Sequence, residues 1–383
     1  MLPFKVETPQ SKLDAIRARV AGFPWFPAPD DEGAAWSRGV NTAYLKELCA
    51  YWLDGFDWRA REAVLNRYPQ FTAEVDGFPL HFVHVVGEAG GKRPLLLTHG
   101  WPGSHFEFWG LIDRLAFPSL HGGHAADAFD VVIPSLPGYG FSGRPSRPIG
   151  QRATAGLFDA LMTRTLGYRH YLAQGGDWGG LVTSWIGFDH GAHCKAIHLN
   201  MIGFRPTPAT PQSDAEKAWL DHSQLAMQLE GAYFMEQATK PQTLAMALMD
   251  SPVGTAAWIL EKFHGWSDLK GGDLESVYTK DQLLTNIMIY LVTDSIATSV
   301  WYYRALLEEN GGVGLPAGKR CETPTAFANF PGEKIYSAPP RSWADRAYNV
   351  TRWTEMSGGG HFAAMERPDE FLADVRAWAR QAW

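Results

Sequence analysis

The sequence predicts an α/β fold, with a mostly parallel central sheet flanked by helices, an inserted all-helical cap and a helical N-terminal extension. Two observations support this prediction. From residue 93 onward, short apolar runs that end in turn residues alternate with helical stretches, which is typical of parallel strands covered on both faces. After an apolar run near residue 200 the strand pattern stops, and it resumes only near residue 323.

The N-terminal extension, residues 1–88, is expected to be mostly helical, because its apolar residues recur at helical spacing. The first helix is expected to begin with Thr8 or Ser11 as its cap. An alternating apolar stretch closes the extension and predicts a hairpin that turns at Asp76-Gly77.

The remaining chain divides into three parts. We expect the first part of the core over residues 89–203, the helical cap over residues 204–318 and the second part of the core over residues 319–383. A proline-rich link opens the cap, and the helical patterns after it contain no convincing strand. The expected core strands are contained in residues 93–100, 129–138, 170–177, 194–204, 323–333 and 349–361.

Composition argues against several classes of protein. The formal net charge of −7 and the absence of a basic run argue against a nucleic-acid partner. No run reaches about 18 uninterrupted apolar residues, so no membrane span is expected. The three widely spaced cysteines, Cys49, Cys194 and Cys321, form no disulfide or zinc pattern, and with the lack of an apolar signal core they favour a cytoplasmic location.

Two weaker motifs carry no function. Residues 138–143 match G-x-G-x-x-G, but neither the helix nor the acidic residue of a dinucleotide site follows them. The pairs His121/His124 and His190/His193 are spaced like metal ligands, but no carboxylate or cysteine in the sequence pattern completes either set. We interpret all four as loop or surface histidines and expect no metal.

The stretch "YLAQGGDWGGLVTSW", residues 171–185, reads as a strand end, a glycine-rich turn and the start of a helix. That layout is a nucleophile elbow, in which a sharp turn exposes the attacking side chain. Asp177 occupies the position where a serine would be expected. The alternative interpretation is that Asp177 only caps the helix that follows it.

Three further features favour the elbow. His361 lies in a glycine-rich loop after the last expected strand, where this architecture carries its histidine. Glu333 lies just past the preceding strand and is the expected acid that orients His361, with Asp345 in a loop and Glu355 in the last strand as rivals. The backbone N–H groups of the residues after His99-Gly100 and after the nucleophile are suited to form an oxyanion hole; they belong to Trp101 and Trp178. Together these features predict an α/β-hydrolase core.

A carboxylate nucleophile indicates a particular chemistry. It is already charged at pH 7 and can attack a saturated carbon in line, so it suits an epoxide or an alkyl halide and needs no cofactor. The product is an ester of Asp177, which water activated by His361 then cleaves. A halide leaves as an anion, but an epoxide oxygen needs a proton. A tyrosine can donate one, so tyrosines of the cap are expected to face Asp177.

The chain resembles the microsomal-type epoxide hydrolases essentially from end to end. The stretches that carry the resemblance are "YLKELCAYWLDGFDWRAREAVLNRYPQF", "HGWPGSHFEF", "GGDWGG", "QATKPQT", "DSPVGTAAWILEKF" and "GGGHFAAMERP". The resemblance implies that Tyr303 and Tyr233 are the ring-opening tyrosines, although Tyr302 adjoins the first and Ala232 replaces an expected glycine before the second. Because the chain begins at the family's cover segment rather than at an anchor, a soluble member is expected.

The resulting hypothesis is an epoxide hydrolase that acts on an apolar small-molecule epoxide, with no cofactor, nucleic acid or membrane span. A haloalkane dehalogenase-like hydrolase would share the aspartate nucleophile, but the tyrosine pair and the N-terminal extension disfavour it. A non-catalytic hydrolase-fold binding protein is disfavoured by the intact Asp177, Glu333 and His361. The sequence leaves the oligomeric state open and is compatible with a homodimer.

Overall fold

A single nine-stranded sheet forms the core of the computed structural model, which describes residues 1–90, 92–309 and 314–383. The strand order is β1-β2-β3-β5-β4-β6-β7-β8-β9. All neighbours from β5 to β9 run parallel, whereas β1, β2, β3 and β5 pair antiparallel. The strands are β1 (Leu2–Phe4), β2 (Gln70–Val75), β3 (Phe78–Val85), β4 (Pro94–Thr98), β5 (Asp130–Pro134), β6 (Tyr171–Gly175), β7 (Cys194–Leu199), β8 (Cys321–Asn329) and β9 (Tyr348–Glu355).

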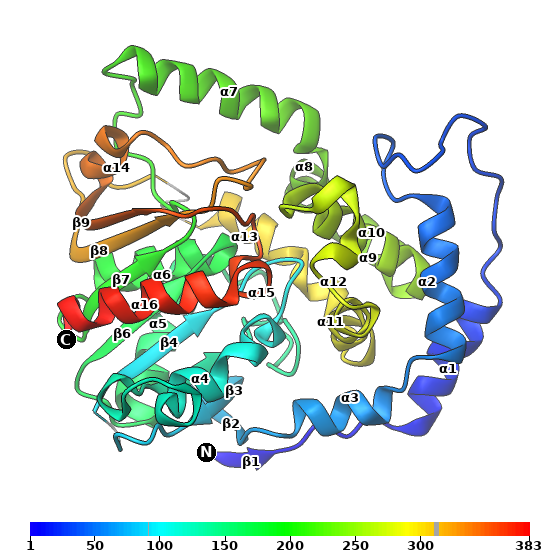
Figure 1. Ribbon diagram of the computed structural model, residues 1–383, viewed down its shortest axis with the longest axis horizontal. Coiled ribbons are helices and arrows are strands. Elements are labelled where there is room, and N and C mark those ends of the chain that lie inside the picture. Colours follow the sequence, from blue (N-terminus) through cyan, green and yellow to red (C-terminus); the bar gives the residue numbers. More distant parts are fainter. Residues whose placement is uncertain (91, 310–313) are drawn as a thin grey trace.

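The predicted α/β class and the predicted hairpin are confirmed. β2 and β3 are joined at Asp76-Gly77, and both turn residues have positive φ. Every residue of β4, β5 and β6 is buried, which explains their unbroken apolar runs, because a central parallel strand is covered on both faces. In Figure 1, α16 (Pro368–Ala382) and α4 (Ile112–Ala116) lie in front of the sheet, and α5 (Gln151–Ala160) and α6 (Asp177–Asp189) lie behind it.

The segment between β7 and β8 is helical, as the sequence predicts, and Figure 1 shows most of its helices beyond one end of the sheet. An isolated bridge between Arg205 and Gly314 is its one β-type pairing among the described residues. Residues 310–313 of the expected cap lie outside the described residues, and the cap boundaries stay a prediction. The helices are α7 (Asp214–Glu230), α8 (Ala232–Thr239), α9 (Pro241–Asp250), α10 (Pro252–Trp266), α11 (Lys280–Val292), α12 (Ile296–Ser299) and α13 (Trp301–Glu308).

Short helices complete the core and the loops around the cap. Two of them, α14 (Arg341–Ala347) and α15 (Ala363–Glu366), flank β9 in the chain. A π-helical turn, η4 (Leu161–Thr165), extends α5. The 3-10 turns are η1 (His105–Leu111), η2 (Pro118–His121), η3 (Ala125–Asp127), η5 (Lys270–Gly272) and η6 (Leu274–Ser276).

The N-terminal helices α1 (Gln10–Ala21), α2 (Thr42–Asp54) and α3 (Trp58–Leu65) follow the outer side of the cap in Figure 1. The expected cap of α1 is wrong, because Pro9 precedes the helix and no side chain caps it. Thr8 Oγ1 instead accepts a hydrogen bond from Trp58 Nε1 at 2.9 Å, and Ser11 lies inside the helix. The hydroxyl of Thr8, which the sequence pattern predicted to cap α1, therefore forms a tertiary contact with α3 instead.

No single helix among the described residues has the length and apolarity to cross a membrane. Two pairs of consecutive helices reach that length and apolarity together, but they bend by 117° and 90°.

Close packing of α6 on the sheet depends on two glycines. A Cβ at Gly179 would lie 1.9 Å from the carbonyl oxygen of Thr98 in β4. A Cβ at Gly175 would lie 2.1 Å from the carbonyl oxygen of Gly179. Backbone atoms cannot yield as a flexible side chain does, so both positions require glycine.

We expect Gly179→Ala to lower the free energy of unfolding by about 3 kcal/mol, because the new methyl group forces the start of α6 away from β4. Urea unfolding followed by circular dichroism measures the change. Gly156→Ala is the matched control, since Gly156 lies within α5 and its added Cβ would contact nothing within 4 Å. Gly156→Ala is expected to raise the free energy of unfolding by about 0.5–1 kcal/mol. Equal stabilities for Gly179→Ala and the parent protein would contradict the packing argument.

Candidate active site

Asp177 stands at a sharp turn between β6 and α6. Its φ is +49°, a left-handed conformation that is uncommon for a residue with a side chain and recurs at functional sites. The helix begins at Asp177, its N-cap residue is Gly176, and no side chain caps it. The alternative that Asp177 serves as a helix cap is therefore wrong, and its carboxylate is free for other contacts.

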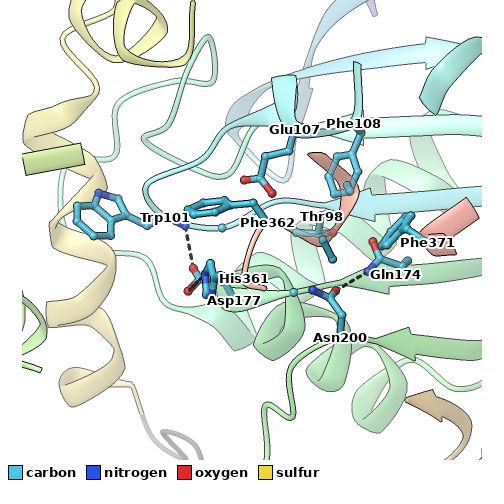
Figure 2. Close-up of a pocket in the computed structure, with 14 residues that line it drawn as sticks. Thr98, Trp101, Glu107, Phe108, Gln174, Asp177, Asn200, His361, Phe362 and Phe371 are labelled. Carbon is cyan, nitrogen blue, oxygen red and sulfur yellow. Dashed lines mark hydrogen bonds and ion pairs between the residues drawn. The ribbon is translucent and has the colours of Figure 1, made fainter. Parts of the chain in front are cut away.

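The carboxylate of Asp177 is held by a backbone group from the loop after β4. The N–H of Trp101 donates to Asp177 Oδ1 at 2.8 Å, as Figure 2 shows. This approach requires glycine before Trp101, because a Cβ at Gly100 would lie 2.2 Å from the same oxygen. A matching bond from Trp178 is not among the hydrogen bonds of the described residues, so its place in an oxyanion hole stays a prediction.

His361 and Glu333 complete the predicted group of three. His361 Nδ1 lies 2.5 Å from Glu333 Oε2, and the other oxygen, Oε1, accepts the N–H groups of Ile335 and Tyr336. His361 Nε2 lies 3.3 Å from Asp177 Oδ2 without a well-aligned hydrogen bond. Glu333 thus fixes the ring of His361, and Nε2 faces the carboxylate of Asp177.

The two rival acids lie elsewhere. Asp345 is in α14 rather than in the expected loop, and it pairs with Arg341 at 3.6 Å. Glu355 ends β9, where it accepts hydrogen bonds from Asn329 and from its neighbour Trp353. Neither contacts the imidazole of His361 among the described interactions.

Two opposing effects set the pKa of His361. Burial lowers it, but the charges and hydrogen bonds of Glu333 and Asp177 outweigh burial and hold the pKa well above its ordinary value. The imidazole is therefore held in its protonated form at neutral pH.

The two predicted tyrosines approach this centre from the cap. The ring of Tyr303, in α13, meets Trp178 edge-on at 4.6 Å between centroids. The ring of Tyr233, in α8, stacks on Trp101 at 5.5 Å. Burial raises the pKa of both phenols well above the ordinary value, so both carry their protons. The neighbouring hydroxyl of Tyr302 points instead to Thr154 Oγ1, at 2.8 Å.

A cavity of about 320 Å³ opens beside Asp177 and Tyr303. Most of its wall is apolar, and a dry wall of this kind suits an apolar ligand. The apolar lining residues are Trp178, Leu181, Met201, Ile202, Phe204, Trp219, Met227, Phe234, Leu306, Ile335, Pro339 and Trp343.

Glu107 was missed at this site by sequence reasoning. It lines a small chamber together with Asp177 and His361, and Figure 2 shows all three side chains. The chamber has a volume of about 20 Å³, which holds roughly one water molecule. Burial raises the pKa of Glu107 to about 8, although the nearby His361 opposes the shift. The signal was present in "HGWPGSHFEF", where Glu107 is the lone acid in an aromatic stretch.

The prediction that no carboxylate completes a histidine pair is wrong for His190 and His193. Asp159, from α5, lies 3.3 Å from His190 Nδ1 and 3.0 Å from His193 Nδ1. The potential ligand atoms of the three residues lie within 4.8 Å of one another. Asp159 also accepts a hydrogen bond from Tyr171, so this cluster ties α5 to the turn before β7. It lies apart from the residues that line the chamber and the cavity at Asp177.

Known proteins resemble this chain along nearly its whole length. Residues 1–108 match the family model for the epoxide hydrolase N terminus, and residues 93–248 match the α/β hydrolase fold. Epoxide hydrolase 1 of Sus scrofa is 36% identical, covering 98% of this chain and 87% of its own length. The structure of Aspergillus niger epoxide hydrolase has a TM-score of 0.85 at 32% identity, covering 100% of this chain and 96% of its own. The juvenile hormone epoxide hydrolase of Bombyx mori has a TM-score of 0.86 at 29% identity, covering 99% and 94%.

The raised pKa of Glu107 predicts a pH-dependent stability. Between the ordinary carboxyl value and about 8 the folded protein holds a proton that the unfolded chain releases, so stability falls as pH rises. We expect the Tm of the parent protein to fall more steeply than that of Glu107→Gln between about pH 5 and about pH 8. Thermal unfolding at several pH values measures this, with the exposed Glu7→Gln as control. Parallel Tm curves for parent and Glu107→Gln would contradict the assignment.

Proposed function

This chain belongs to the microsomal-type epoxide hydrolase family and is an epoxide hydrolase, and we propose that it opens its substrate through a covalent ester at Asp177. One observation carries the proposal. The carboxylate of Asp177, held by the N–H of Trp101, faces an imidazole whose other nitrogen is held by Glu333. The nucleophile and the base for the second step are thus both oriented.

In the first step, a carboxylate oxygen of Asp177 attacks an epoxide carbon and the carbon–oxygen bond of the ring breaks. The departing oxygen takes a proton from the tyrosines of the cap, Tyr303 and Tyr233. Burial supports this role because it keeps both phenols protonated until the developing alkoxide requires a proton.

In the second step, water attacks the carbonyl carbon of the ester, with His361 as base and the N–H of Trp101, joined by that of Trp178, stabilising the oxyanion. The first step prepares the base. Esterification removes the negative charge of Asp177, which is one of the two charges that raise the pKa of His361. The imidazolium can then release its proton and accept another from water.

The substrate we propose is an apolar, bulky or aryl epoxide. The cavity beside Asp177 supports this, because tryptophan, phenylalanine, leucine, isoleucine and methionine side chains make up most of its wall. Its volume of about 320 Å³ accommodates a small aromatic molecule.

We also propose a cytoplasmic location. In support, Cys49, Cys194 and Cys321 are all free and buried, as expected where thiols stay reduced. The homodimer compatible with the sequence stays a prediction.

His361→Gln is expected to accumulate the ester, because the variant keeps the nucleophile and the tyrosines but lacks the base of the second step. Mass spectrometry of the protein after mixing with an aryl epoxide would show one added substrate mass. Asp177→Asn is the control and should show no addition, since an amide is a poor nucleophile. Full diol turnover by His361→Gln would contradict the assigned roles.

Removing both cap hydroxyls, Tyr303→Phe with Tyr233→Phe, is expected to lower the rate of ester formation by roughly 10²-fold or more, as general acids contribute about that much. The rate of ester hydrolysis should change little, because water attack involves His361 instead. Rapid-quench kinetics with excess enzyme separates the two steps. A double variant that forms the ester at the parent rate would refute the role of the tyrosines.

A further inference from the structure

The hydroxyl of Tyr233 has a partner that the family motifs do not include. It lies 2.7 Å from the hydroxyl of Tyr336, and either oxygen can be the donor. Tyr233 comes from α8 of the cap, whereas Tyr336 lies in the loop after β8 of the core. Tyr336 lines the cavity beside Asp177 and Tyr303, while Tyr233 is only 3% exposed.

A contact with Glu333 also fixes the position of Tyr336. Its backbone N–H donates to Glu333 Oε1 at 3.2 Å, the carboxylate whose other oxygen orients His361. Its ring centroid lies 6.2 Å from that of His361. The hydroxyl therefore has a defined position relative to Asp177 rather than the freedom of a loop side chain.

We propose that the Tyr233–Tyr336 pair, rather than Tyr233 alone, supplies a proton to the opening epoxide, with Tyr336 as a positioning residue that acts through Tyr233. The inference rests on the proposed ring-opening mechanism and deepens it. When one hydroxyl of such a pair loses its proton, the other donates a hydrogen bond to the phenolate, and the negative charge is shared.

The proton balance closes without another reactant. As Asp177 bonds to carbon, the epoxide carbon–oxygen bond breaks, the alkoxide takes one proton from the pair, and the second proton stays between the two phenol oxygens. In the second step, the oxygen of water joins the carbonyl carbon of the ester. The bond between that carbon and the substrate oxygen then breaks, and the departing alkoxide takes the proton that water gave to His361. The second proton of water, released as the Asp177 carboxylate re-forms, restores the pair, and the diol leaves.

The buried surroundings of the two phenols disfavour a negative charge that is confined to one oxygen. Burial raises the pKa of Tyr233 and of Tyr336, and Asp177 adds to both shifts. A single phenolate at this depth would be poorly stabilised, because burial removes it from bulk solvent. A second hydroxyl at 2.7 Å replaces part of that lost solvation.

Tyr336→Phe is expected to slow ester formation about tenfold, equivalent to about 1.4 kcal/mol, while ester hydrolysis keeps its rate. Rapid-quench single turnovers with excess enzyme and an aryl epoxide, read by protein mass, give both rates. In a Tyr233→Phe background, adding Tyr336→Phe should change ester formation by less than about twofold, since the pair is already broken. Tyr171→Phe is the matched control, because it removes a buried hydroxyl hydrogen-bonded to Asp159 at the far end of β6.

Each other outcome overturns the inference in a recognisable way. A parent rate of ester formation in Tyr336→Phe, with Tyr233→Phe slow, removes Tyr336 from the reaction and leaves the proposed function intact. Equal losses in both steps with a lowered Tm indicate a structural role alone. A full tenfold loss in the Tyr233→Phe background as well makes Tyr336 an independent donor. Parent rates in both single variants refute the assignment of Tyr233 itself, and with it part of the proposed function.

Discussion

The position of one imidazole between two carboxylates governs this active site. His361 lies 2.5 Å from Glu333 and 3.3 Å from Asp177, and the two acids together outweigh the effect of burial on its pKa. The two carboxylates favour the protonated form of the ring, because each of them faces one imidazole nitrogen. The same arrangement cannot act as a base. In the proposed mechanism, the order of the two chemical steps therefore follows from electrostatics: the ring becomes a base only after esterification has removed the charge of Asp177.

The cap packs on the core through the same residues that surround Asp177. Trp101 and Trp178 follow Gly100 and Asp177 in the chain, and the cap tyrosines Tyr233 and Tyr303 pack on their indole rings. The N–H of Trp101 holds the carboxylate while its side chain supports Tyr233. Such ring contacts fix geometry as well as burying apolar area. These ring contacts hold both tyrosines at a fixed position relative to Asp177, although they lie far from it in sequence.

Sequence patterns predicted the features that depend on local constraints. The elbow at Asp177 and the buried strands leave marks in consecutive residues, because glycine at tight approaches and unbroken apolar runs are required there. The predictions that were wrong concern side chains whose partners are distant in sequence. Thr8 contacts Trp58 instead of capping a helix, and Asp159 reaches His190 from another helix. No periodicity along the chain indicates which side chain comes from a separate element, so the contact of Tyr336 with Tyr233 also emerged only from the fold.

In the proposed mechanism, the loop after β8 contributes to both chemical steps within four residues. Glu333 contacts His361, the proposed base of ester hydrolysis, and the hydroxyl of Tyr336 contacts Tyr233, a proposed proton donor in ring opening. The two functions are mechanically linked, since the N–H of Tyr336 holds one oxygen of Glu333. A shift of this loop would therefore move an acid and a hydroxyl together, and the two steps would lose rate together. Removal of the Tyr336 hydroxyl alone leaves the backbone bond to Glu333 in place, so it separates the step that needs a proton from the step that needs a base.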